Sequence, residues 1–313
     1  MTMKSGGYRE RMVILSQVDN GRKLGSFITD HYVVSIVLSN DGRWIILGER
    51  PYPNSHNRDT LATVWDANTY QKATEIKYNE QDWNGQLMER VVDTSPDSTR
   101  FAMSSKTGLS LCVWSIITGE RLLGPLLFGE ALYAKHVKFS PHGDRLAIAV
   151  ASTVSDSPGR FYLYDSQTGH LLIDIPEVDV SSFTWCNNSQ RIFAAIGDKF
   201  QCLDVSASSP GFTNFGLVMC STYIALARNS SFLVSLDNDG SITFWNTSTL
   251  TRIGPALKHC GDEKLSSIIL SANNGYLAGI ISGRKRSITI WSLRDLLPSF
   301  CFMKVRTPNP ALF

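Results

Sequence analysis

The sequence predicts an all-β protein of the β-propeller class, because one unit of short strands recurs along its 313 residues. Each copy contains an alternating apolar segment that ends in an aromatic residue, and successive aromatic residues are 49, 50, 81 and 46 positions apart. Leu203 divides the long interval, since it ends a similar segment. A repeat of roughly 40 to 50 residues with four strands per copy is typical of propeller blades. The aromatic positions are Trp65, Trp114, Tyr164, Trp245 and Trp291.

The copy from Ala134 to Ile175 shows the predicted unit in full. Its apolar side chains follow a period of two, which indicates β-strands, and Gly, Pro, Asn and Ser separate the segments. The polar turn 140–143 joins the first strand to the second, and the longer loop 152–160 precedes the third. The four predicted strands are 134–139, 145–150, 161–164 and 170–175.

A turn of similar chemistry follows the first strand of every complete copy. Pro presets a negative φ, whereas Asn, Asp and Gly tolerate a positive φ or bond their own backbone. Each of these turns can therefore close a hairpin. The turns are 39–42, 95–98, 140–143, 186–189, 227–230 and 271–274.

Taken together, these features resemble the WD-repeat β-propeller family. The resemblance rests on the polar turn, the small apolar strand after it, an Asp six residues before a Trp, and a Thr-Gly-like turn that follows. Asp59 and Asp239 keep this six-residue spacing to Trp65 and Trp245. The resemblance covers nearly the whole chain, from about residue 11 to about residue 305.

The chain departs from the family at the start of each repeat, where a Gly-His pair is expected. Only His31 and His259 are candidates for that histidine. The family's hydrogen-bonded tetrad of His, Ser, Asp and Trp is therefore expected to be incomplete in every blade. We expect blades of unequal stability as a result.

The repeats predict six complete four-stranded blades and an N-terminal half blade of two strands. Residues 12–25 align with 111–123, so the chain starts in the middle of a repeat, with Ser16 at the Trp position. This arrangement predicts a single domain over 1–313, a seven-bladed type of ring that is incompletely closed. The alternative is a chain cut from a longer parent. Because it contains Pro308 and Pro310, the tail 304–313 is expected to be irregular.

Composition is that of an ordinary globular protein, with 43% hydrophobic and 19% charged residues. The net charge of +2 gives no reason to expect nucleic acid as a partner. No apolar run approaches the roughly 20 residues that would span a membrane, and we do not expect a secretory signal, because the first residues include Lys4, Arg9 and Arg11 and no apolar core. We expect a cytoplasmic protein that is monomeric or part of a larger complex.

Motifs for catalysis or metal binding are missing from the sequence. It contains no phosphate-binding Gly-rich loop, no His-Glu-x-x-His and no Gly-x-Ser-x-Gly. The six cysteines form no Cys-x-x-Cys pair, and the six histidines are scattered. We therefore predict no enzyme activity, no metal and no cofactor. A propeller whose central channel holds an enzyme site or binds nucleic acid is the alternative.

The recurring tryptophans have two interpretations. They could be exposed platforms that stack on bases or on methylated lysine. Their repeated place at a strand end instead favours packing between blades. On that interpretation, Trp245→Ala should cost about 3 to 5 kcal/mol of stability.

The resemblance implies a non-catalytic scaffold that binds a protein partner, whose identity is unknown. Gly124-Pro125 and Gly254-Pro255 follow predicted outer strands, and this detail resembles the WD domains of fungal NACHT-type receptors. The chain would then be the ligand-sensing module of a larger multidomain receptor.

Two insertions, 49–58 and 152–160, fall in the loop before the Trp-bearing strand and are expected to share one face of the propeller. Loops on a rigid scaffold often carry function, and Tyr and Arg are common interface anchors. Trp83 lies in a polar loop and is a further candidate for contact. Tolerated insertions with a solvated charge cluster are the alternative. The predicted partner-binding residues are Tyr52, His56, Arg58, Trp83, Arg160, Arg284, Lys285 and Arg286.

Overall fold

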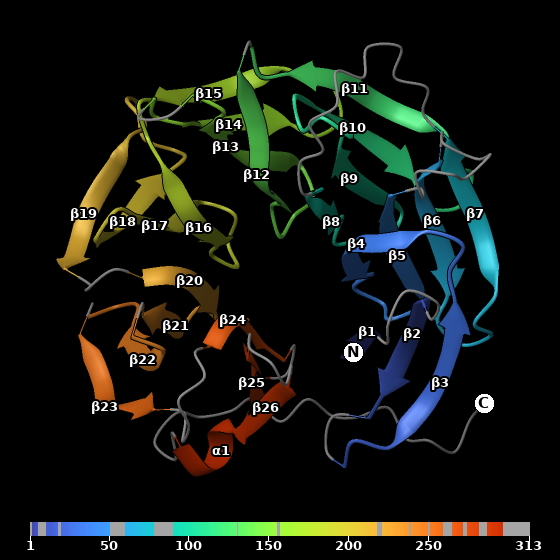
Figure 1. Cartoon of the computed structure of the whole chain (residues 1–313). Coiled ribbons are helices and arrows are strands. Elements are labelled where there is room, and N and C mark those ends of the chain that lie inside the picture. Colours follow the sequence, from blue (N-terminus) through green and yellow to red (C-terminus); the bar gives the residue numbers. More distant parts are fainter. Residues whose placement is uncertain are drawn as a thin grey trace. The chain divides into compact units, whose positions relative to one another are not determined.

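A computed structural model shows an all-β fold, a β-propeller, which confirms the predicted fold class. Each sheet is built from strands that are consecutive in sequence and antiparallel, as hairpins require (Figure 1). The structure describes residues 2–5, 11–17, 20–50, 60–77, 90–129, 131–154, 157–217, 221–237, 239–249, 251–258, 265–271, 274–281 and 287–296.

The chain divides into two compact units, Met1–Val180 with Ala207–Gly211 and Ser181–Ser206 with Phe212–Phe313. The single domain predicted over 1–313 and the closure of its ring stay predictions. The tail 304–313 lies outside the described residues.

The first unit contains one three-stranded sheet and three four-stranded sheets. In Figure 1, the first strands β4, β8 and β12 lie on its inner side and the fourth strands β7, β11 and β15 on its outer side. Its strands are β1 (Thr2–Ser5), β2 (Arg11–Ser16), β3 (Lys23–Ile28), β4 (Tyr32–Leu38), β5 (Trp44–Arg50), β6 (Thr60–Asp66), β7 (Lys72–Lys77), β8 (Val92–Thr94), β9 (Arg100–Ser104), β10 (Ser110–Ser115), β11 (Arg121–Leu127), β12 (Leu132–Phe139), β13 (Arg145–Ser152), β14 (Arg160–Asp165) and β15 (Leu171–Pro176).

The second unit contains two four-stranded sheets, the first of which begins at Val180, and one three-stranded sheet that a short helix follows. Its elements are β16 (Val180–Trp185), β17 (Arg191–Ile196), β18 (Lys199–Asp204), β19 (Phe212–Leu217), β20 (Ser221–Leu226), β21 (Phe232–Asp237), β22 (Ser241–Asn246), β23 (Arg252–Lys258), β24 (Leu265–Leu270), β25 (Tyr276–Ile281), β26 (Ser287–Ser292) and α1 (Leu293–Leu296).

The two three-stranded sheets are the ones at the ends of the chain. The N-terminal sheet has one strand more than the two predicted, because β1 pairs with β2 from Thr2↔Ile14 to Ser5↔Arg11. Residues 2–5 show no apolar alternation, so this pairing has no signature in the sequence. The last repeat shows three strands, and residues after 296 lie outside the described part of the chain.

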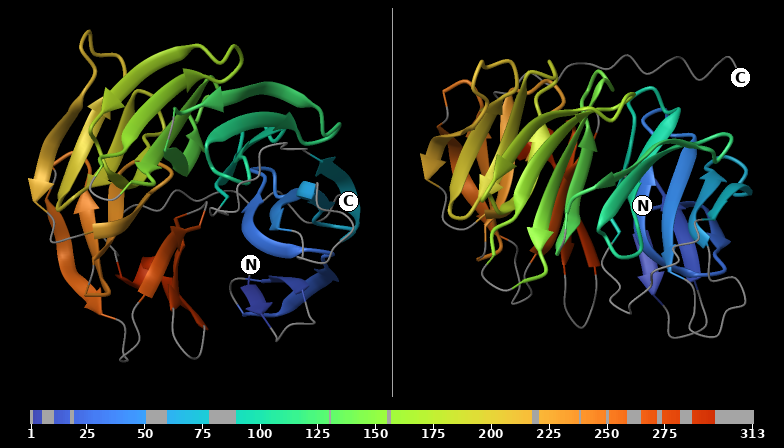
Figure 2. Two further views of the ribbon diagram at one scale, coloured as in Figure 1. Left: turned by 45° about the horizontal axis from the view of Figure 1, so that its top comes forward. Right: turned by 90° about the horizontal axis from the view of Figure 1, so that it is seen from above.

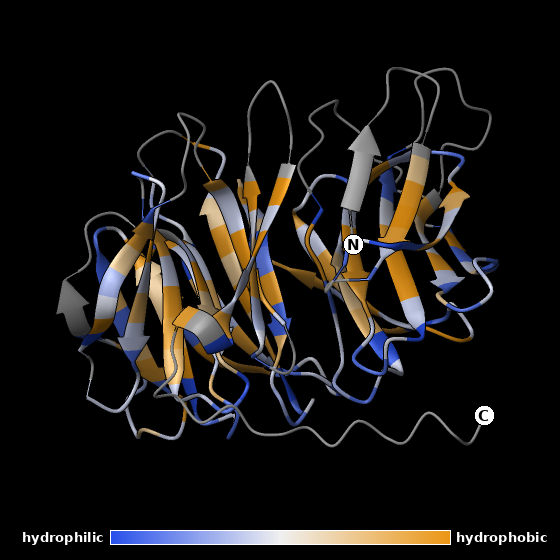
Figure 3. Cartoon of the chain, turned by 90° about the horizontal axis from the view of Figure 1, so that it is seen from below, coloured by the Kyte–Doolittle hydropathy of each residue, from blue (hydrophilic) through white to orange (hydrophobic). Residues whose placement is uncertain are grey.

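The core lies between neighbouring sheets, which stand side by side within each unit (Figure 2). Figure 3 shows apolar colour along the strands and polar colour at many of the turns. In the first unit, Phe27 of β3 stacks on Trp65 of β6 with ring centroids 4.2 Å apart. In the second, Phe200 of β18 meets Trp245 of β22 edge to face at 5.6 Å. Side chains from adjacent sheets therefore interdigitate in each unit.

Candidate interaction site

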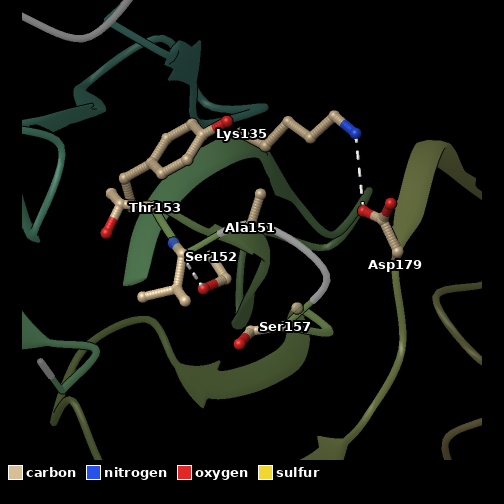
Figure 4. Close-up of a pocket in the computed structure, with 9 residues that line it drawn as sticks. Lys135, Ala151, Ser152, Thr153, Ser157 and Asp179 are labelled. Carbon is tan, nitrogen blue, oxygen red and sulfur yellow. Dashed lines mark hydrogen bonds and ion pairs between the residues drawn. The ribbon is translucent and has the colours of Figure 1, made fainter. Parts of the chain in front are cut away.

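Residues 152–154, 157 and 159 of the insertion 152–160 line a pocket of about 340 Å³ in the first unit (Figure 4). The described lining residues of the loop follow the end of β13, and the neighbouring strand β12 contributes Tyr133 and Lys135. The pocket is lined by Tyr133, Lys135, Ala151, Ser152, Thr153, Val154, Ser157, Gly159 and Asp179. Its volume is at the lower end of the roughly 300 to 1,000 Å³ that is usual for ligand pockets.

A β-bulge places Lys135 at this pocket. The β12–β13 register passes from Ala134↔Val150 directly to His136↔Ala149, so Lys135 has no partner on β13. A bulge bends the strand locally and re-aims the unpaired side chain. Equivalent register shifts occur in β4, β20 and β24, where the unpaired residues are Val34, Thr222 and Ser266. Lys135 is the charged residue among these four described positions.

The opposite charge at the pocket comes from Asp179, just before β16. Its Oδ1 lies 3.5 Å from the Lys135 Nζ. The Lys135 side chain is 33% exposed and the Asp179 side chain 66% exposed, so the lysine is the more deeply set of the two. Figure 4 shows Lys135 extending toward Asp179, with a dashed line that marks the ion pair.

Backbone contacts hold the described residues at both ends of the loop. The Val178 N–H donates to the Gly159 carbonyl at 3.1 Å, and the Thr153 N–H donates to the Ala131 carbonyl at 2.7 Å. A Cβ at position 159 would overlap the Val150 carbonyl oxygen and lie 3.0 Å from that of Val178. Only glycine fits this close approach of three backbone segments.

Arg160, a predicted partner-binding residue, is held within its own sheet. Its guanidinium binds both carboxylate oxygens of Asp174 on β15, at 3.2 and 2.7 Å. Its Cζ also lies 5.8 Å from the centre of the Tyr162 ring. These contacts, above all the hydrogen bond with Asp174, raise the pKa of Arg160. Arg160 therefore borders the pocket loop without lining the pocket.

All the other predicted contact residues lie outside the described residues, so the structure does not test them. The same holds for Asp59, which was predicted as a structural repeat position. The residues concerned are Tyr52, His56, Arg58, Asp59, Trp83, Arg284, Lys285 and Arg286.

The recurring aromatic residues lie on the third strand of their sheets. Trp65, Trp114 and Tyr164 are buried, whereas Trp245 and Trp291 are half-buried and pack against the core clusters of the second unit.

Trp65 belongs to a buried polar chain. Its Nε1 donates to the Thr63 hydroxyl at 2.9 Å, and Thr63 donates to the Glu49 carboxylate at 2.5 Å. Burial raises the pKa of Glu49. The Arg90 guanidinium donates to the backbone carbonyls of Glu49 and Leu61. Within the described residues, the Glu49 Oε2 is buried without a hydrogen-bond partner.

Trp245 has a corresponding chain that ends on Asp237. Its Nε1 donates to Ser235 at 3.0 Å, and Ser235 donates to the Asp237 carboxylate at 3.4 Å. Asp239, which the six-residue spacing singles out, instead accepts the backbone N–H of Ser241 at 2.9 Å and closes the turn. The carboxylate that receives the tryptophan network was therefore missed from the sequence.

Two described thiols and one described carboxyl have raised pKa values. Burial raises the pKa of Cys202 to about 11 and also raises that of Cys186, so both are protonated thiols near neutral pH. Burial raises the pKa of Asp93 to about 6, but its carboxylate accepts the Phe139 N–H at 2.8 Å and ties β8 to β12. No group of three or more potential metal ligands occurs among the described residues. No described helix is long and apolar enough to cross a membrane.

Sequence comparison assigns no family. No protein-family model matches the chain, and no curated protein matches it significantly.

Proposed function

We propose that this chain is a non-catalytic protein-interaction domain of the WD-repeat type, the ligand-sensing part of a larger receptor. Propeller folds commonly serve as interaction scaffolds, but a fold does not specify a partner. The proposal therefore rests on one observation: described residues of the insertion 152–160 line a pocket.

The chemistry of this pocket suits binding more than catalysis. Rigid strands hold Tyr133, Lys135 and Ala151, while the loop contributes hydroxyl groups and the aliphatic Val154, which is 55% exposed. Groups that are held in place before binding lose less entropy when a partner binds. The proposal places the chain in the cytoplasm, where thiols stay reduced, and the described cysteines Cys112, Cys186 and Cys202 form no disulfide.

Affinity purification of the tagged full chain from cells that express it tests this function. Val154→Asp alters the pocket rim, and Arg284→Glu, Lys285→Glu and Arg286→Glu together reverse the predicted charge cluster. Lys77→Glu is the matched control, because Lys77 is an exposed residue on the outer strand β7.

We expect at least one protein to be recovered with wild type and Lys77→Glu and to fall about tenfold with Val154→Asp, as loss of one good contact predicts. The charge-reversal variant should lower recovery of the same protein. An identical set of proteins from all variants would contradict the proposed function.

A further inference from the structure

The Lys135–Asp179 pair leaves hydrogen-bonding capacity unused at the pocket. Its separation of 3.5 Å exceeds the roughly 2.7 to 2.9 Å of a charge-assisted hydrogen bond. An ammonium has three donors, and a carboxylate accepts through two oxygens. A ligand that bridges the two groups from the side can therefore gain hydrogen bonds while the two charges stay in place.

The charges at the pocket argue against a singly charged ligand. Lys135 and Asp179 contribute +1 and −1, so the formal charge of the described lining is zero. An anion bound to the Lys135 ammonium would lie within a few ångströms of the Asp179 carboxylate. A cation bound to Asp179 would meet the same repulsion from Lys135, and this repulsion offsets much of the attraction. The pocket therefore favours a neutral polar group.

A primary amide fits the adjacent donor and acceptor. The side chain of Asn or Gln carries an acceptor oxygen and an NH₂ donor on one carbon. Its oxygen can accept from Lys135 while its NH₂ donates to Asp179. A single trans backbone amide points its C=O and N–H in opposite directions, so it cannot serve both groups in this way.

The remaining lining suits the stem of such a side chain. Val154 supplies an exposed aliphatic surface, and Ala151 lies at the end of β13. Thr153 and Ser157 also line the pocket (Figure 4), and the Thr153 hydroxyl donates to the Ala131 carbonyl at 3.2 Å.

We propose that this pocket binds the primary amide of an Asn or Gln side chain presented by a protein partner. This inference rests on the proposed function and gives the chemistry of one of its contacts. Lys135 donates to the amide oxygen, Asp179 accepts from the amide nitrogen, and Gly159 keeps the loop close enough to form the pocket wall.

Methyl NMR of the full chain, labelled at alanine methyl groups, tests this proposal. Ala151 lines the pocket and reports binding, whereas Ala147, which is fully buried on β13, reports the integrity of the fold. The probes are the N-acetyl, N′-methylamide derivatives of glutamine, glutamate and lysine, which differ only in the side chain.

We expect the glutamine probe to shift the Ala151 methyl signal saturably and to bind about tenfold more tightly than the other two, since about one hydrogen bond to a charged group is at stake. Lys135→Met should weaken glutamine binding about tenfold while the Ala147 signal stays in place. Asp179→Asn should shift the preference toward glutamate, because the lysine charge then has no carboxylate beside it. A purely structural role for the pair would not produce that change.

Two results would overturn the inference. The first is a glutamate or lysine probe that binds wild type as tightly as the glutamine probe. The second is the absence of a saturable Ala151 shift with glutamine. Either result leaves the proposed function standing if the affinity-purified protein is still lost with Val154→Asp, so the two failures are distinguishable.

Discussion

Trp65 and Trp245 occupy the same position in their repeats, yet the two residues are anchored differently. Trp65 is 9% exposed and stacks on Phe27, whereas Trp245 is half-buried and meets Phe200 edge to face. Each indole N–H donates to a hydroxyl that donates to a carboxylate. The two sites thus share a chain from indole to hydroxyl to carboxylate but differ in burial and in ring packing.

The carboxylates stand at equivalent places. The partner of Trp65 on the second strand is Ile45, and that of Trp245 is Leu233. Glu49 and Asp237 each lie four residues after these partners.

The hydroxyls explain the difference between the two sites. At the Trp245 site, Ser235 and Thr243 both donate to Asp237. At the Trp65 site, apolar Leu47 takes the place of Ser235, so Thr63 alone links indole and carboxylate. The more deeply buried site therefore depends on fewer hydrogen bonds.

Removing the indoles should give the largest difference in stability loss between the two sites. Trp65→Ala should cost about 3 to 5 kcal/mol, as buried tryptophans do. Trp245→Ala should cost less than about 3 kcal/mol, below the range expected from the sequence, because part of the Trp245 surface already meets solvent. Denaturant unfolding of each variant against wild type provides the free energies. An equal or larger loss for Trp245→Ala would show that burial does not distinguish these sites.

Removing the linking hydroxyls should give a smaller difference with the same sign. Thr63→Val leaves the Trp65 N–H and the Glu49 carboxylate unpaired inside the protein and should cost about 2 to 3 kcal/mol. Ser235→Ala should cost about 1 kcal/mol, because Thr243 still donates to Asp237. The same unfolding measurement applies. A neutral Thr63→Val would mean that water reaches the buried pair.

The smallest effect concerns pH and is specific to the Trp65 site. Burial raises the pKa of Glu49 in the folded protein above the value of about 4.5 in the unfolded chain. The contribution of protonated Glu49 to the free energy of unfolding is therefore fully present below pH 4.5 and is lost as pH rises through the pKa of the folded state. Glu49→Gln keeps an acceptor for Thr63 and removes this titration. The free energy of unfolding of Glu49→Gln minus the free energy of unfolding of wild type should therefore increase as pH rises above 4.5. Asp93, which also titrates at a raised pKa, cancels in this difference. A difference independent of pH would contradict the assignment.

The sequence predicted the features that depend on local pattern. Alternation and turn residues identified the strands of the repeats, because a strand pairs with its neighbour through a short hairpin. The same comparison located the insertion 152–160, whose described residues line the pocket. Features that depend on pairing between strands were missed. In the sequence, Lys135 looks like an ordinary residue of an alternating strand. Only the register between β12 and β13 shows that it lies in a bulge.

The tryptophan networks show the same limit. The six-residue spacing singled out Asp239, whose carboxylate closes a turn. Asp237 lies two residues earlier and receives the hydroxyls because the end of β21 faces β22. No pattern in the sequence indicates a role for Asp179, because that role depends on Lys135, which is 44 positions away in the sequence.

The central claim is that the recurring aromatic strands provide packing while the loop before them contacts the partner. Amide hydrogen exchange of the full chain, with and without the protein recovered by affinity purification, tests it most directly. We predict slower exchange at the described residues of the loop 152–159 and around Asp179, with no change in β6 or β22. Slower exchange confined to the outer strands β7, β11 and β15, with none in that loop, would contradict the claim.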